Sequence, residues 1–296
     1  MSLSVWVAGA RPRTLPAAMA PVLAGVAAGL GVAPSPPLWR LIVVPVLCLG
    51  LALTLQIGVN YANDYSDGVR GVDDVRVGPT RLTASGLATP RAVRRAAFLS
   101  FAAAAVLGLL VVAISGNWWL LAVGAACLAA AWLYTGGPRP YGYLGLGELM
   151  VFVFFGLVAT VGTTYVTFGA ITPASWVAAT GMGALASALL VVNNLRDLAA
   201  DARVGKRTLA TRLGDTGTRV LFVALIVVGA ASVVGMMALT TPWVGLGLLG
   251  FALVIGPVAR ILRGASGQDL IAMLQAASLT ELAMAVGLLA GMVIAL

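Results

Sequence analysis

Histidine is absent from this sequence, which excludes histidine general bases, histidine-ligated haem and histidine-containing zinc sites. The only two cysteines, Cys48 and Cys127, both lie in apolar runs, so neither a disulfide framework nor a cysteine-based metal site is indicated. Charge is scarce as well, at 9% of 296 residues, whereas soluble domains carry about 25%. Because so little polar surface cannot cover a water-soluble fold of this size, the sequence predicts an all-α membrane protein.

Apolar residues make up 60% of the chain, and the few charges between them delimit candidate membrane helices. A spanning helix needs about 20 apolar residues. The charge-free stretches, divided at short polar turns, predict nine spans in a single domain, residues 1–296. The predicted spans are residues 15–33, 38–60, 93–114, 118–135, 145–168, 174–195, 218–239, 243–261 and 271–294.

The basic residues predict the orientation of these spans. Lysine and arginine concentrate in the cytosolic segments of membrane proteins. With a cytosolic N-terminus, nine spans leave only Arg40 outside among the 18 basic residues. The net charge of +8 is therefore interpreted as a consequence of the cytosolic loops being rich in basic residues, and not as a sign of nucleic-acid binding. The first span has no Ala-x-Ala cleavage site and is expected to be retained. The Arg- and Ala-rich composition is typical of a GC-rich bacterium, so a multi-pass protein of the bacterial inner membrane is expected.

Seven of the ten acidic residues lie in the two segments that follow the second and the sixth predicted spans. These seven are Asp64, Asp67, Asp73 and Asp74 in the first cluster and Asp197, Asp201 and Asp215 in the second. If both spans continue as helices, the spacings i, i+4, i+7 from Asn60 and i, i+4, i+8 from Asn193 each form one face. Both clusters are expected at the cytosolic end of the bundle.

The two clusters also match each other at a constant distance along the chain. Asn60 and Asn193 are 133 residues apart, as are Asp64 and Asp197. This spacing predicts two similar four-helix halves, about 10–135 and 145–262, followed by a ninth helix.

Carboxylates held together repel each other and need a cation. Oxygen ligands without cysteine or histidine favour Mg²⁺, Mn²⁺ or Ca²⁺, and Mg²⁺ commonly completes its shell with substrate phosphate. Nearby basic residues suit the remaining phosphate oxygens: Arg70, Arg76, Arg81, Lys206 and Arg207. The alternatives are solvated ion pairs, above all for Asp73, Asp74 and Asp215, and helix capping or interhelical bridging by the asparagines. A cation or lipid carrier is the alternative from another functional class.

Four motifs in order resemble the UbiA superfamily of intramembrane prenyltransferases. They are Arg11-Pro12-Arg13-Thr14-Leu15-Pro16, the run from Asn63 to Arg81, the run from Tyr134 to Tyr143, and the run from Asn193 to Ala210. The run Gly68–Arg81 is similar to the branch that prenylates 1,4-dihydroxy-2-naphthoate. It has Gly71 where the general superfamily pattern has another aspartate, with Asp73 and Asp74 just beyond. The basic position after the fourth span, which is often lysine in this superfamily, is Arg139 here.

The resemblance implies Mg²⁺-dependent transfer of a polyprenyl chain from its diphosphate to an aromatic acceptor, with loss of the acceptor's carboxyl group as CO₂. The implied metal ligands are Asp64, Asp67, Asp73, Asp197 and Asp201. The implied substrate-binding residues are Asn60, Asn63, Arg76, Arg81, Arg139, Tyr141, Asn193 and Lys206. Tyr134, with Tyr141, would stabilise the allylic cation. Another acceptor, such as 4-hydroxybenzoate, stays open, as do the roles of Glu148, Glu281 and Gln56.

Overall fold

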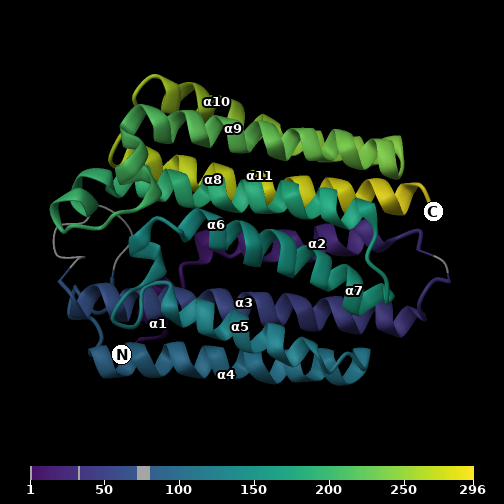
Figure 1. The fold of residues 1–296 in the computed structure, drawn as a ribbon, viewed down its shortest axis with the longest axis horizontal. Coiled ribbons are helices and arrows are strands. Elements are labelled where there is room, and N and C mark those ends of the chain that lie inside the picture. Colours follow the sequence, from purple (N-terminus) through teal and green to yellow (C-terminus); the bar gives the residue numbers. More distant parts are fainter. Residues whose placement is uncertain (1, 33, 72–80) are drawn as a thin grey trace.

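The computed structural model describes residues 2–32, 34–71 and 81–296, and throughout these ranges the regular secondary structure is helical. The helices form an elongated bundle whose connections gather at its two ends (Figure 1). The α-helices are α1 Leu3–Ala10, α2 Pro16–Gly29, α3 Leu38–Val69, α4 Pro90–Ser115, α5 Leu120–Leu133, α6 Gly147–Val151, α7 Gly162–Phe168, α8 Pro173–Arg203, α9 Leu209–Leu239, α10 Ala252–Leu262 and α11 Asp269–Ile294. A π-helical stretch, Phe152–Val161, joins α6 to α7, and a 3₁₀ stretch, Pro242–Phe251, leads into α10.

Within the described ranges, seven helical segments are long and apolar enough to cross a membrane. They are Leu38–Val69, Pro90–Ser115, Gly147–Phe168, Pro173–Arg203, Leu209–Leu239, Pro242–Leu262 and Asp269–Ile294. The predicted spans 15–33 and 118–135 coincide with the shorter apolar helices α2 and α5, of 14 residues each. The sequence predicts no helix before residue 15, and α1 was missed because eight residues are too few for a spanning pattern.

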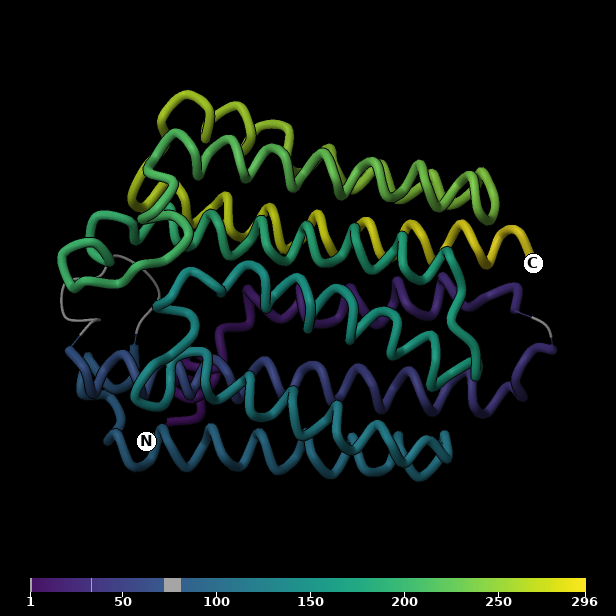
Figure 2. Tube along the Cα trace, in the orientation of Figure 1, coloured from purple at the N-terminus to yellow at the C-terminus, as the bar shows by residue number. Residues whose placement is uncertain are grey.

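The helices that carry the acidic clusters extend beyond their predicted ends. α3 continues from residue 60 to Val69, and α8 continues from residue 195 to Arg203. Both clusters therefore begin on helical turns, so side chains three or four positions apart do share a face. α3 and α8 end at the same end of the bundle, on the left of Figure 1 and Figure 2.

Local sequence signals fix the start of α8 and the turn that follows its end. Thr172 and Ser175 form a capping box, and Pro173 occupies the first helical turn. After α8, Gly205 adopts a φ of +74°, a left-handed conformation that suits glycine and reverses the chain toward α9.

The main apolar core lies between α2, α8, α9 and α11. Its large buried members include Met182, Leu185, Phe222 and Met284. α2 packs against both α3 and α8, and thus connects the two helices that carry the acidic clusters. A second cluster, around Tyr61, Leu82 and Phe101, fixes α1 and α4 against α3.

Candidate active site at the ends of α3 and α8

A small polar cleft of about 60 Å³ lies where α3 and α8 end. Its walls come from five segments that are far apart in the chain. The lining residues are Arg11, Asn63, Asp67, Arg81, Tyr134, Thr135, Gly142, Tyr143, Asn193, Asn194, Asp197, Asp201, Lys206 and Thr208. The cleft therefore combines members of both predicted acidic clusters with basic and aromatic side chains.

Of the two described aspartates of the first cluster, Asp67 is the one that faces this cleft. Its Oδ1 accepts a hydrogen bond from the Tyr143 hydroxyl at 2.5 Å. Its Oδ2 lies 3.9 Å from the Arg81 Nη2 and 3.9 Å from the Lys206 Nζ. Burial and the Asp67 carboxylate raise the pKa of Tyr143, so its hydroxyl keeps the proton that it donates.

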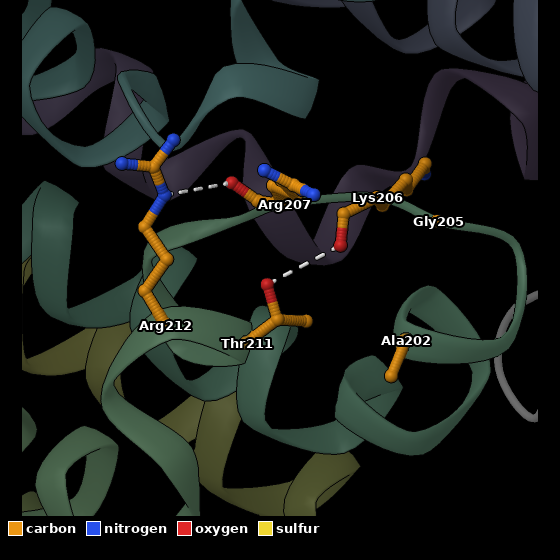
Figure 3. Close-up of a pocket in the computed structure, with 6 residues that line it drawn as sticks. All are labelled: Ala202, Gly205, Lys206, Arg207, Thr211 and Arg212. Carbon is orange, nitrogen blue, oxygen red and sulfur yellow. Dashed lines mark hydrogen bonds between the residues drawn. The ribbon is translucent and has the colours of Figure 1, made fainter.

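Lys206 bridges the two acidic clusters. Its Nζ lies 3.6 Å from Asp201 Oδ1, besides its contact with Asp67, and stands 4.3 Å from the centre of the Tyr143 ring. Backbone contacts hold it in place, since its amide donates to the Asp201 carbonyl and its carbonyl accepts from the Thr211 hydroxyl (Figure 3). A positive charge thus already occupies the place between the carboxylates of α3 and α8.

Asp197 and Asn193 meet Arg196 at the α8 wall. The Arg196 Nε and Nη2 donate to the two carboxylate oxygens of Asp197, both at 2.8 Å, and Nη2 also donates to Asn193 Oδ1 at 2.8 Å. The Arg196 side chain is almost fully buried. The charge of Asp197 is therefore balanced by the neighbouring arginine.

Asp64 does not line the cleft. It is fully buried, and its oxygens accept hydrogen bonds from the backbone amides of Leu82 and Thr83, at 2.7 and 2.8 Å. Both Asp64 oxygens thus hold the segment that enters α4, and the role of Asp64 as a metal ligand stays a prediction. Gly68 permits this approach, since a Cβ there would lie 2.6 Å from the Thr83 side chain.

The two asparagines of α3 also differ in their surroundings. Asn63 lines the cleft and accepts from the Thr135 hydroxyl at 2.7 Å. Asn60 lies outside it, donating to the Ala10 carbonyl at 2.9 Å and accepting from Gln56 at 3.4 Å. Asn60, which Gln56 contacts within α3, therefore ties the N-terminal segment to this helix.

The midchain motif contributes Tyr134 to the cleft, but not Tyr141 or Arg139. The Tyr134 and Tyr141 rings pack edge to face at 5.5 Å. The Tyr141 hydroxyl donates to the Ala130 carbonyl at 2.9 Å, and burial raises its pKa. Arg139 is exposed and is not among the lining residues. Its role as a substrate-binding residue stays a prediction.

Asp215 is not among the residues that line the cleft. Asp215 is exposed and forms a bidentate ion pair with Arg219, at 2.6 and 2.8 Å, as in the ion-pair alternative. Asp73, Asp74 and Arg76 fall in 72–80, outside the described residues.

Arg11 and Tyr143 line the cleft although neither was among the predicted site residues. Arg11 is the non-glycine residue with a positive φ, 53°, in the described chain, and its buried Nη2 has no hydrogen-bond partner among the described residues. Such strain and such an unsatisfied donor are typical of functional positions. Tyr143 lies 76 residues from Asp67, and only the motif that contains it hinted at a role.

The donor set fits a divalent cation that shares its shell with a phosphate. Within the described ranges, no group of three or more acidic residues is close enough to hold a metal by itself. Mg²⁺ needs only one or two carboxylates when waters and substrate phosphates complete its shell. Asp67, Asp197 and Asp201 are the residues of the cleft able to hold it.

This combination of an apolar helix bundle and a terminal cleft of carboxylates and basic side chains is that of an intramembrane prenyltransferase. Residues 18–292 match the model of the UbiA prenyltransferase family. The chain belongs to this family.

Curated relatives and solved structures agree with the assignment. The chain is 48% identical to the 1,4-dihydroxy-2-naphthoate octaprenyltransferase of Mycobacterium tuberculosis, over 95% of this chain and 94% of that one. It is 39% identical to the Escherichia coli enzyme of the same name, over 72% and 70%. An apo UbiA homologue from Aeropyrum pernix shares the fold, with a TM-score of 0.68, 16% identity, and 94% and 97% of the two chains covered. A UbiA homologue from Archaeoglobus fulgidus bound to GPP and Mg²⁺ has a TM-score of 0.61, 14% identity, and coverage of 97% and 99%.

Proposed function

We propose that this protein transfers a polyprenyl group from polyprenyl diphosphate to 1,4-dihydroxy-2-naphthoate, with Mg²⁺ as cofactor, to give demethylmenaquinol, the reduced form of demethylmenaquinone. The observation that carries the proposal is the meeting of Asp67, Asp201 and Lys206 at the end of an apolar bundle. The 48% identity to a 1,4-dihydroxy-2-naphthoate octaprenyltransferase supports the acceptor.

The diphosphate head group would bind in the cleft. Arg11, Arg81 and Lys206 line it and offer donors to phosphate oxygens. Asp67, Asp197 and Asp201 would hold Mg²⁺, with Asp73 and Arg76 as further candidates from the sequence alone. When bound, Mg²⁺ would supply Lewis-acid stabilisation of the diphosphate leaving group. Lys206 would exchange its contacts with Asp67 and Asp201 for contacts with the diphosphate.

In the reaction, the allylic carbon–oxygen bond breaks and the diphosphate leaves with the electron pair. The Tyr134 ring, in the cleft wall, would stabilise the allylic cation through its face. The acceptor's ring carbon that bears the carboxyl group forms the new carbon–carbon bond, and CO₂ then departs and leaves its bonding pair in the ring. No ring proton has to be removed, so the absence of histidine is no obstacle.

The bundle would place this chemistry at the membrane surface. We infer that α2 and α5 complete a set of nine spans, with a cytosolic N-terminus and the cleft facing the cytosol of a bacterial cell. The polyprenyl tail would leave the cleft between helices and enter the bilayer. The two similar halves, about 10–135 and 145–262, stay a proposal based on the 133-residue spacing.

A turnover assay on the purified full-length protein in detergent tests the function. A radiolabelled polyprenyl diphosphate is offered with 1,4-dihydroxy-2-naphthoate or with 4-hydroxybenzoate, and with either Mg²⁺ or EDTA. We expect Mg²⁺-dependent prenylation of the naphthoate together with CO₂ release. Prenylation of the benzoate alone would assign another acceptor. Binding of the diphosphate without transfer to either acceptor would favour a carrier and contradict the proposal.

A further inference from the structure

Glu148 is a buried acid of the first turn of α6 that plays no part in the mechanism above. It is 7% exposed. Its Oε1 accepts a hydrogen bond from Asn194 Nδ2 at 2.8 Å, and its backbone carbonyl accepts from the Ser187 hydroxyl at 3.0 Å. α6 is thus fastened to α8 at two points around this residue. Gly147 permits the approach, since a Cβ there would lie 3.2 Å from Leu190.

The carboxyl group of Glu148 is only half satisfied. Its Oε2 is buried and has no hydrogen-bond partner within the part of the chain that the structure describes. A buried polar atom without a partner destabilises a fold, and such atoms in native proteins are associated with function. Packing α6 against α8 does not require a polar side chain at this position, so the hydrogen bond from Asn194 to Oε1 points to another purpose.

Asn194, the partner of Glu148, belongs to the wall of the cleft. It lies three residues before Asp197 and seven before Asp201, so the three side chains follow one face of α8. The side-chain amide of asparagine carries one oxygen and one nitrogen, which point in different directions. Because Nδ2 is directed to Glu148, Oδ1 is the atom left for the cleft.

We propose that Glu148 is a positioning residue that orients the Asn194 amide, so that Oδ1 joins Asp197 and Asp201 as a third oxygen ligand for a divalent cation. This inference rests on the proposed function, which places Mg²⁺ in the same cleft. Glu148 itself stays outside the coordination shell, because it does not line the cleft. Outer partners of this kind fix the direction of a ligand atom, and their loss typically weakens metal binding about 10- to 100-fold.

Mn²⁺ binding to the purified full-length protein, without substrate, tests this assignment. The dissociation constant is measured by electron paramagnetic resonance of the free ion. Glu148→Leu and Asn194→Ala should each weaken binding about 10-fold or more. Glu148→Gln should bind Mn²⁺ nearly as wild type does, because the Gln oxygen accepts the same bond from Asn194. The double variant Glu148→Leu/Asn194→Ala should bind no more weakly than Asn194→Ala alone, since both act through one amide.

Glu281 provides the matched control. It is fully buried in α11, and neither of its carboxylate oxygens has a hydrogen-bond partner among the described residues. Glu281→Leu removes a buried acid without touching the cleft, and should leave Mn²⁺ affinity unchanged. Thermal unfolding without metal establishes that each variant is folded before its affinity is compared.

Wild-type affinity in Glu148→Leu would overturn the inference, as would equal losses in Glu148→Leu and Glu148→Gln, which would show that the charge itself is required. Absence of Mn²⁺ binding by the wild-type protein would also overturn it. The turnover assay then decides separately whether the proposed function stands.

Discussion

Asp64 and Asp67 lie one helical turn apart on α3, yet their surroundings give them different tasks. Asp67 faces Tyr143, Arg81 and Lys206 in the cleft. Asp64 is directed to the amides of Leu82 and Thr83. We therefore propose that the motif that contains both aspartates includes one residue for the substrate side and one that organises the segment after it.

Replacement of each aspartate by asparagine should separate these tasks. In Asp64→Asn, the new side-chain amide has only one oxygen for the two backbone N–H donors. Its NH₂ group would face the second N–H, which would be left without an acceptor. Because hydrogen bonds to charged groups contribute about 1.5–3 kcal/mol, this variant should lose about 2 kcal/mol of stability, and with it turnover. Asp67→Asn should keep the stability and lose turnover. Thermal unfolding in detergent and the turnover assay provide the two readouts, and equal unfolding temperatures in both variants would contradict this division.

Tyr143 should act on catalysis through the Asp67 carboxylate. Tyr143→Phe removes a 2.5 Å hydrogen bond to that group. Such a bond contributes about 1.5–3 kcal/mol, and about 1.4 kcal/mol corresponds to a tenfold change in rate, so kcat/KM should fall roughly 10- to 100-fold. Tyr141→Phe, which removes a hydroxyl that bonds a helix carbonyl outside the cleft, is the control and should change turnover much less.

The pH dependence of the same variant follows from the raised pKa of Tyr143. The neutral phenol is the donor, and it is present at every pH below the raised pKa. The contribution of Tyr143 should therefore persist to at least about pH 10, the ordinary tyrosine value. The ratio of wild-type to Tyr143→Phe activity should stay constant between neutral pH and that limit. A ratio that falls within this range would show that the hydroxyl ionises earlier.

At the scale of elements, the end of α3 and the segment after Arg81 must lie unusually close together. Gly68→Ala would place a Cβ 2.6 Å from the Thr83 side chain. Overpacking of this kind costs about 1–3 kcal/mol, which exceeds the roughly 0.5–1 kcal/mol that alanine contributes over glycine in a helix. The variant should therefore unfold at a lower temperature and lose turnover.

Gly124→Ala is the matched substitution within α5. An added Cβ there meets no atom within 4 Å, so only the helical preference of alanine remains. This variant should be slightly more stable than wild type and equally active. The same sign of stability change at both positions would contradict the close contact of Gly68 with Thr83.

At the scale of the whole molecule, the sequence predicted which helices bring the acidic clusters together. The apolar runs and the helical spacing of Asn60, Asp64 and Asp67 depend on local sequence alone, and α3 continues through these residues. The partners of the individual acids could not be predicted, because they come from distant segments. The backbone amides that donate to Asp64 come from residues 18 and 19 positions later in the sequence. Tyr143, which donates to Asp67, lies 76 residues from it, and Arg11, which lines the cleft, precedes α2. Such contacts depend on the path of connecting segments, for which composition and periodicity carry no signal.

The orientation of the whole bundle is the prediction with the largest consequence for access of substrates. Thr216 is exposed in the first turns of α9, and Ser35 is exposed just before the start of α3. The starts of α9 and α3 lie at opposite ends of the bundle, with the start of α9 at the end where α3 and α8 end (Figure 1). In a variant without Cys48 and Cys127, single cysteines at these positions report the side of the membrane. Because all basic residues except Arg40 fall on the side assigned to the cytosol, a membrane-impermeant maleimide should label Ser35→Cys in intact spheroplasts. Thr216→Cys should react only in inverted vesicles. Labelling of Thr216→Cys from outside would place the cleft on the external face, where a cytosolic aromatic acid could not reach it directly.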